Sequence, residues 1–179
     1  MAQDGILNVN FTATDNRQLT IYSTADASWG VGYACRWKLV GRAAGVSRDK
    51  SINVGFAHPT NKFDWSPYPT IVMEEYDDYN SPFSRLLSGT CASYGCYNYN
   101  QLPTRNSPGD ILEIRRIGSV AKFYRNDVYV TTNDYNVPTD ELRGVITAGG
   151  WPDGTIWARF DYYLIRKIIE PEPVVTIEQ

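Results

Sequence analysis

An alternation of apolar and polar side chains with a period of two residues runs through much of this chain. In "GVGYACRWKLVG", residues 30–41, one face collects the apolar side chains of Val31, Tyr33, Cys35, Trp37 and Leu39. Successive side chains of a β-strand point to opposite faces, so this pattern predicts a strand with one buried face. The same period appears in the stretches "KSINVGFAH", "TIVMEEY", "ILEIRRIG" and "RGVITAGG". No stretch of more than ten residues shows a convincing apolar period of 3.6, which would predict a helix.

A hairpin is predicted in "SVAKFYRNDVYVTT", residues 119–132. Its turn is Asn126-Asp127, because both residue types tolerate a positive φ. In that register Phe123 lies opposite Val130, and Tyr124 lies opposite Tyr129 on the other face.

The last apolar stretch before the C-terminal tail, residues 156–168, is predicted to be a long strand with one buried face. It holds no Gly or Pro, and its alternate positions predict that Phe160, Tyr162 and Leu164 point inward and Arg159 outward. A helix is the poorer interpretation, because Ile and Tyr are weak helix formers.

Many strands spaced 8–15 residues apart in one chain of 179 residues predict an all-β fold. The expected architecture is an antiparallel two-sheet β-sandwich of the jelly-roll type. Residues 1–169 form a single domain in this interpretation. Residues 170–179 form a Pro/Glu-rich linker or tail, since Pro171 and Pro173 favour an extended chain.

Charge and hydropathy argue against two classes of partner. The net charge is -3 and the Lys and Arg residues are scattered, so no nucleic-acid partner is expected. No apolar run approaches the roughly 18 residues that span a bilayer, so no membrane insertion is expected.

The three cysteines suggest one disulfide and one buried thiol. Cys91 and Cys96 lie five residues apart with Gly95 between them, which predicts a small disulfide loop if the protein is exported. Cys35 is expected to be a buried free thiol. A zinc site is not expected, because the chain has a single histidine, His58.

Two stretches in the second half carry a resemblance to a known family. "GDILEIRRIGSVAKFYRNDVYVTT" and "WARFDYYLIRKIIEPEP" resemble the C-terminal half of concanavalin A-like lectin/glucanase sandwiches, and in particular uncharacterised modules of archaeal and bacterial surface proteins. Asp161-Tyr162 and Ile165-Arg166-Lys167 carry the match. The resemblance implies a concanavalin A-like jelly roll in an extracellular or cell-surface setting.

Glucanases of this fold carry a Glu-x-Asp-x-(x)-Glu strand, whose alternate carboxylates act on the sugar. In "VMEEYDDYN" Glu75 and Asp77 share a face, but no third carboxylate follows at the required place. We therefore expect that the protein is not an enzyme, and a glycoside hydrolase is the remote alternative. No cofactor is expected either; the weak calcium candidates are Asp77, Asp78, Asp134 and Asp140.

Aromatic residues outside the regular pattern suggest a binding role. Residues 57–68 and 90–109 break the strand rhythm, and flat rings on such segments can stack on sugar rings. The predicted carbohydrate-binding residues are Trp65, Tyr97, Tyr99 and Trp151. The sequence thus favours a non-catalytic carbohydrate-binding or adhesive module whose partner is a glycan or surface polysaccharide. The alternative is a structural subunit or spacer of a cell-surface or filament assembly, which contacts other copies or domains of a surface protein.

Overall fold

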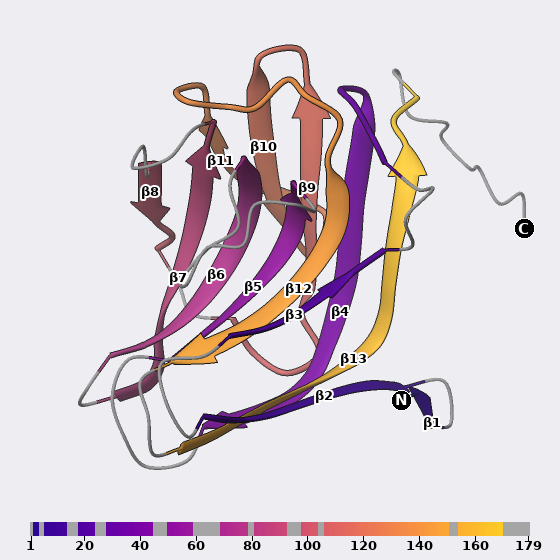
Figure 1. Ribbon diagram of the computed structural model, residues 1–179. Helices are drawn as coiled ribbons and strands as arrows, with labels where there is room; N and C mark the ends of the chain where they lie inside the picture. The colour runs from indigo at the N-terminus through magenta and orange to yellow at the C-terminus, as the bar shows by residue number, and fades with distance from the viewer. Residues whose placement is uncertain are drawn as a thin grey trace, which may run out of the picture.

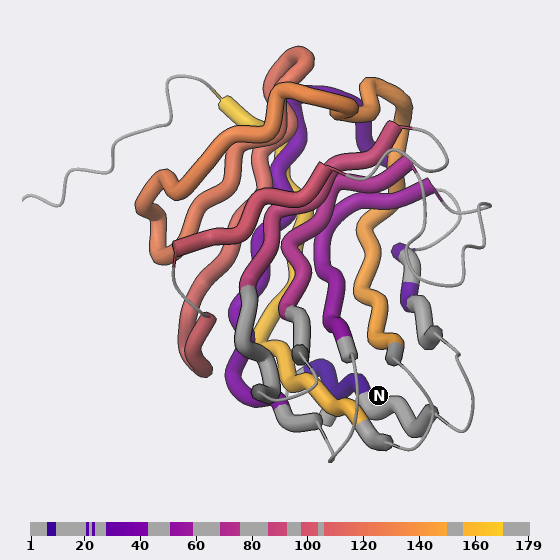
Figure 2. Tube along the Cα trace, turned by 90° about the vertical axis from the view of Figure 1, so that its left-hand side faces the viewer, coloured from indigo at the N-terminus to yellow at the C-terminus, as the bar shows by residue number. Residues whose placement is uncertain are grey.

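A computed structural model of the chain shows two β-sheets packed face to face (Figures 1 and 2). It describes residues 2–3, 6–13, 18–23, 28–44, 50–58, 69–78, 81–92, 98–103, 106–150 and 154–169. One sheet has seven strands in the order β1-β2-β13-β4-β9-β10-β11, and the other has six in the order β3-β12-β5-β6-β7-β8. All pairs of neighbouring strands are antiparallel, which confirms the predicted all-β sandwich.

The strands of both sheets have the following bounds. The seven-stranded sheet contains β1 (Ala2–Gln3), β2 (Ile6–Ala13), β4 (Tyr33–Ala44), β9 (Ile111–Ile117), β10 (Val120–Arg125), β11 (Val128–Asn133) and β13 (Gly154–Lys167). The six-stranded sheet contains β3 (Gln18–Tyr22), β5 (Lys50–Ala57), β6 (Thr70–Asp78), β7 (Ser81–Cys91), β8 (Asn98–Gln101) and β12 (Arg143–Gly150).

The core lies between the sheets and is built from the apolar members of each alternation. From the six-stranded sheet it takes Phe56 and Met73, and from the seven-stranded sheet Trp37, Ile114 and Phe123, all of them at most 1% exposed. Cys35 is a fully buried thiol in this core, as the sequence predicted. No helix in the described part of the chain is long and apolar enough to cross a membrane.

The 126–127 turn forms as predicted, but the register beyond it differs by one residue. Asn126 and Asp127 have φ values of 50° and 64°, which suits a tight hairpin turn. Tyr124 pairs with Tyr129 as expected, whereas Phe123 pairs with Thr131 and not with Val130. The register shifts between Phe123 and Tyr124, so Val130 is an extra residue in a β-bulge.

A similar irregularity changes which side chains of β13 point inward. Phe160 is fully buried opposite Leu39, as predicted, and Arg159 is exposed. The pairing with β4 then shifts on both sides of Phe160, and Asp161 is left without an opposite residue. The prediction that Tyr162 and Leu164 point inward is therefore wrong: Leu164 is 39% exposed.

Tyr163 and Ile165 take the inward positions beyond this bulge and pack against the core. The Tyr163 hydroxyl donates a hydrogen bond to the Gly55 carbonyl across the sandwich at 2.9 Å. A Cβ at Gly144 would lie 2.4 Å from that hydroxyl oxygen, so only glycine leaves room for the ring there.

Candidate functional site

A row of polar residues crosses the centre of the six-stranded sheet on its outer face. Thr147 of β12 lies opposite Asn53 of β5, which lies opposite Glu74 of β6. Their sequence neighbours, among them Ile52, Ile146 and Met73, point into the core. We call Thr147, Asn53 and Glu74 the polar row.

Glu74 is the ionisable member of the polar row. Its side chain is half-buried and hydrogen-bonded to Ser51, the outward residue that precedes Asn53 by two positions on β5. Burial raises the pKa of Glu74 from 4.5 to about 7, and the hydrogen bond from Ser51 opposes this rise. A carboxyl group with a pKa near neutrality can both give and accept a proton at physiological pH.

The other two members of the polar row have unused hydrogen-bonding atoms. Asn53 is 1% exposed and Thr147 is fully buried. Asn53 donates to the Ser51 hydroxyl at 3.2 Å, but its Oδ1 and the Thr147 Oγ1 have no partner within the described part of the chain. Buried polar atoms in native proteins almost always find a partner, so these two atoms set the polar row apart from the apolar positions on the core side of the same strands.

Tyr99 of β8 lies on the same outer face. It pairs with Gly89 of β7, and a Cβ at Gly89 would lie 2.5 Å from the Tyr99 ring. The ring therefore crosses β7 over the glycine. Gly89 lies on β7, two residues beyond Leu87, which pairs with Glu74 of β6. The usual spacings between strands and along a strand place Gly89 about 8 Å from Glu74. Tyr99 was one of the predicted carbohydrate-binding residues, and it is half-buried in this position.

The remaining predicted site residues stay predictions. Trp65, Tyr97 and Trp151 lie outside the described residues, as does Cys96. Cys91 is buried at the end of β7, and the structure shows no disulfide within the residues it describes. The pairing of Cys91 with Cys96 stays a prediction.

The calcium candidates are only partly within the described part of the chain. Asp134 and Asp140 are exposed on the connection between β11 and β12, and the side chains of Asp77 and Asp78 lie outside the description. Across the described residues, no group of three or more His, Cys, Asp and Glu side chains could hold a metal ion.

Glu75, the carboxylate considered for catalysis, faces the interior instead. It is 6% exposed and forms an ion pair with Arg42 of β4 in the opposite sheet. The Asn106 side-chain amide donates to Glu75 Oε1 at 2.6 Å. Burial raises the pKa of Glu75, while the charge of Arg42 and the Asn106 hydrogen bond lower it. Glu75 therefore links the two sheets and does not face the outer surface.

The sequence contained a signal for Glu74 that the carboxylate spacing concealed. In "TIVMEEY" the core residues Ile71 and Met73 continue by alternation to Glu75, which leaves Glu74 on the outer face with Val72. The polar residues Ser51 and Asn53 alternate with core residues on β5 in the same way. Comparing the polar faces of the three central strands would have found the polar row.

The outer face of the seven-stranded sheet also carries charge, but its central carboxylate is already surrounded by cations. Glu113 is 1% exposed. It is contacted by Arg36 at 3.0 Å, by Arg166 at 3.1 Å and by Arg115. Arg36 also binds Asp127 and holds the pKa of that carboxyl below its usual value. This arrangement stabilises the sheet and leaves Glu113 little capacity to act on a ligand.

Comparison with solved structures identifies the fold. An alginate lyase in complex with dimannuronate aligns with a TM-score of 0.63 at 10% identity, over 90% of this chain and 74% of the lyase. A glycoside hydrolase family 16 endo-glucanase from Bacteroides ovatus aligns with a TM-score of 0.60 at 11% identity, over 92% and 84% of the two chains. The protein has a concanavalin A-like jelly-roll fold. No protein-family profile and no curated protein sequence matches the chain.

A further jelly roll of this kind is a β-1,3-1,4-glucanase from a mouse hindgut metagenome, with a TM-score of 0.58 at 13% identity over 93% of this chain and 81% of the enzyme. Most of the similar structures are glycoside hydrolases or lyases, and this contradicts the expectation that the chain is no enzyme. That expectation rested on the missing glucanase carboxylate pattern. An alginate lyase of the same fold shows that the jelly roll also serves a different class of reaction.

The raised pKa of Glu74 predicts how the stability of this jelly roll depends on pH. The folded protein holds the Glu74 proton more tightly than the unfolded chain, so the free energy of unfolding falls as the pH rises from 4.5 to about 7. One pKa unit corresponds to about 1.4 kcal/mol; allowing for partial exposure, we expect a loss of about 2 kcal/mol from Glu74.

Urea unfolding at several pH values checks this prediction. Glu75 also has a raised pKa and contributes in the same direction, so the informative quantity is the difference between the wild type and Glu74→Gln. The variant is expected to show a flatter profile and a higher relative stability at neutral pH. Parallel profiles for the two proteins would contradict the raised pKa of Glu74.

Proposed function

We propose that this protein is a carbohydrate-active enzyme that holds a polysaccharide against the outer face of its six-stranded sheet. In this proposal Glu74 exchanges a proton with the bound sugar. The observation that carries the proposal is the position of Glu74: a half-buried carboxyl with a pKa of about 7 lies on the outer face, on the strand next to the one that the Tyr99 ring crosses. The proposal also includes an extracellular or cell-surface setting, which the sequence resemblance implies.

The chemistry of the outer face suits a sugar polymer. Sugar hydroxyl groups both donate and accept hydrogen bonds, and so do the Ser51 hydroxyl and the Glu74 carboxyl, which are half-buried on this face. The Tyr99 ring over Gly89 offers an apolar face on which a pyranose ring can stack. A polymer that crosses the strands would meet both features, because they lie on neighbouring strands of one face.

The position of Glu74 suits cleavage of a glycosidic bond. Both hydrolysis and elimination require a proton at the glycosidic oxygen that leaves, and a carboxyl with a pKa near the working pH transfers it efficiently. Glu74 is protonated in a substantial fraction of the molecules at neutral pH. It can therefore act as the proton donor in either reaction class.

Binding to the outer face is tested by changing the stacking ring in two ways. Tyr99→Ala removes the ring, and Gly89→Val places side-chain atoms where the ring now lies. We expect each variant to lower the affinity for a soluble polysaccharide about tenfold, which corresponds to about 1.4 kcal/mol. Isothermal titration against a panel of neutral and uronate-containing polysaccharides measures the effect, and thermal unfolding is followed in parallel.

Tyr129→Ala is the matched control, because Tyr129 is 54% exposed and lies in the other sheet. Its affinity should equal that of the wild type. If Tyr129→Ala and Tyr99→Ala weaken binding equally, the glycan does not lie on the outer face of the six-stranded sheet.

A further inference from the structure

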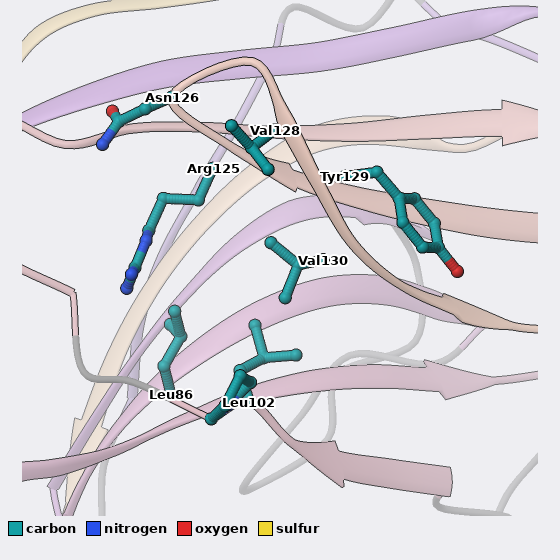
Figure 3. Close-up of a pocket in the computed structure, with 8 residues that line it drawn as sticks. Leu86, Leu102, Arg125, Asn126, Val128, Tyr129 and Val130 are labelled. Atoms are coloured by element: carbon teal, nitrogen blue, oxygen red, sulfur yellow. The ribbon is translucent and has the colours of Figure 1, made fainter.

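A cavity opens at the side of the sandwich where both sheets end in an edge strand. The edges are β8 of the six-stranded sheet and β11 of the seven-stranded sheet. The cavity has a volume of about 400 Å³. It is lined by the β10–β11 hairpin on one side and by β7 and the residues after β8 on the other (Figure 3). A cavity of about 150 Å³ already holds a benzene molecule, so this one has room for more than one aliphatic side chain.

The floor and the rim of this cavity are mostly apolar. Leu86 and Leu102 form the floor and are 1% and 5% exposed. The Leu102 amide donates to the Leu86 carbonyl at 2.8 Å, which fixes these two residues relative to each other. At the rim Val128 is 67% and Tyr129 54% exposed. An aliphatic group that enters the cavity would therefore remove apolar surface from water on both sides.

β11 offers a free strand edge beside the cavity. It pairs with β10 on one side, and among the described strands it has no neighbour on the other. Its sequence, "VYVTTN", contains no charged residue and no proline, and Val and Thr make up most of it. Charged residues and proline are common protections of an exposed edge, because unpaired backbone groups bind another strand. β11 lacks both protections and is suited to accept a further strand.

The hairpin that carries this edge is held in place by its turn. The Asn126 side chain accepts a hydrogen bond from the Ile111 amide at 2.8 Å and donates one to Asp110 at 2.7 Å. Together with the bond between Arg36 and Asp127, these contacts anchor the turn to β9 and β4. The edge is therefore preformed, which lowers the entropy lost when a strand binds to it.

The chain itself contains a stretch suited to this edge. Residues 174–179, "VVTIEQ", contain no proline, so each of their backbone amides can donate a hydrogen bond. In an extended strand Val175 and Ile177 share one face, and the opposite face carries the polar Thr176 and Glu178. The aliphatic face matches the apolar cavity. We call residues 174–179 the C-terminal segment.

The reach of the chain decides which copy the C-terminal segment can serve. A strand added beyond β11 would lie five strand spacings from β13, about 24 Å. The Ile168 amide, just after β13, is bound to the Gly32 carbonyl, and the described residues continue to Ile169. The five residues from Ile169 to Val174 span at most about 18 Å. Val174 thus falls short of the β11 edge of its own chain, and the segment can pair only with the edge of another copy.

We propose that the C-terminal segment of one copy adds as a strand to the β11 edge of another copy. Val175 and Ile177 enter the cavity and cover Leu86 and Leu102, while the backbone of the segment hydrogen-bonds to β11. Backbone pairing holds the segment at the edge, and burial of the aliphatic side chains selects its register. The contact lies apart from the polar row and does not depend on the enzymatic activity proposed above.

Sedimentation velocity of the full chain, over concentrations from about 1 μM to about 1 mM, tests the proposal. We expect the wild type to associate reversibly within this range. Ile177→Asp should weaken the association at least about tenfold, because a charge would have to enter the apolar cavity. Thr176→Asp, on the opposite face of the segment, is the matched control and should associate like the wild type. A wild type that stays monomeric throughout, or an Ile177→Asp variant that associates as well as the wild type, would overturn the proposal.

Variants of the edge identify the partner surface. Val128→Asp places a charge at the rim and should also prevent association, whereas Leu164→Asp, at an exposed position on β13, should not. Equal effects of these two variants would contradict a contact at β11. If Val128→Asp does not fold, the comparison of Ile177→Asp with Thr176→Asp still decides.

Mixing two variants tests the direction of the contact. Neither Val128→Asp nor Ile177→Asp should associate with itself, but the mixture should form a one-to-one complex. The first variant supplies an intact C-terminal segment, and the second supplies an intact edge. Direct pairing of two β11 edges would instead leave Ile177→Asp able to associate with itself and would give no complex in the mixture, and either result would overturn the proposal.

Discussion

Truncation of Phe160 to alanine is expected to lower the free energy of unfolding by about 3–5 kcal/mol. Phe160 is fully buried on β13 and belongs to the main core cluster. Its removal leaves a cavity between the sheets at a point where the β13–β4 pairing is already irregular. Chemical unfolding followed by tryptophan fluorescence and circular dichroism measures the loss.

The neighbours of Phe160 supply the controls. Arg159→Ala and Leu164→Ala should each change the stability by less than about 1 kcal/mol, because both side chains are exposed. Tyr163→Ala should resemble Phe160→Ala, since Tyr163 packs against the core. A large loss at Leu164 together with a small loss at Tyr163 would mean that β13 keeps a regular alternation and that the bulge is absent.

Replacement of Arg116 by methionine is expected to cost about 3–4 kcal/mol. Arg116 is 1% exposed and points into the sandwich, where its guanidinium lies 5.4 Å from the centre of the Phe56 ring. It donates to the backbone carbonyls of Trp29, Pro138 and Asp140, at 3.2 and 2.7 Å for the last two. Methionine keeps much of the apolar volume but leaves these carbonyls without their donor.

The pKa of Arg116 reflects its buried position. Burial lowers it to about 10, although the charge of Asp140 opposes the shift. The guanidinium is thus still charged at neutral pH, and its three carbonyl partners connect the segment before β4 with the segment before β12. Lys122→Met is the control, because it removes a half-buried cation from the outer face of the neighbouring strand. Equal stabilities of the two variants in urea unfolding would contradict the role of Arg116.

Regular alternation made much of the fold predictable. The strands around Trp37, Val54, Ile114 and Ile146 are found where one face of the sequence is continuously apolar. The Asn126-Asp127 turn was predictable because few residue types accept its backbone conformation. These features depend on local chemistry alone.

The predictions that were wrong depend on how neighbouring strands pair. The bulge at Val130 and the irregular pairing around Phe160 change the face of every side chain beyond them, yet neither has a local sequence signal. β8 lies within residues 90–109, which the sequence marked as irregular, and it is short and polar. The partner strand, and not the local sequence, decides such positions.

The candidate site was predicted only in part. Tyr99 was selected because it lies in a Tyr-rich segment, and it does face the same surface as Glu74. Glu74 itself was not selected as a site residue, because the glucanase carboxylate spacing directed attention to Glu75, which binds Arg42 between the sheets. The polar row requires the register of three strands that are distant in sequence, and a single strand does not reveal it.

Release of oligosaccharides by the wild type and by Glu74→Gln tests the central claim most directly. Each protein is incubated with the polysaccharide panel near neutral pH, and the new reducing ends are counted; absorbance of an unsaturated uronate distinguishes elimination from hydrolysis. We expect the wild type to cleave at least one polymer and Glu74→Gln to do so at least about a hundredfold more slowly, with binding retained. Asp134→Asn, which changes an exposed carboxyl elsewhere, should match the wild type. Polysaccharide binding without cleavage by the wild type, or full activity of Glu74→Gln, would contradict the account.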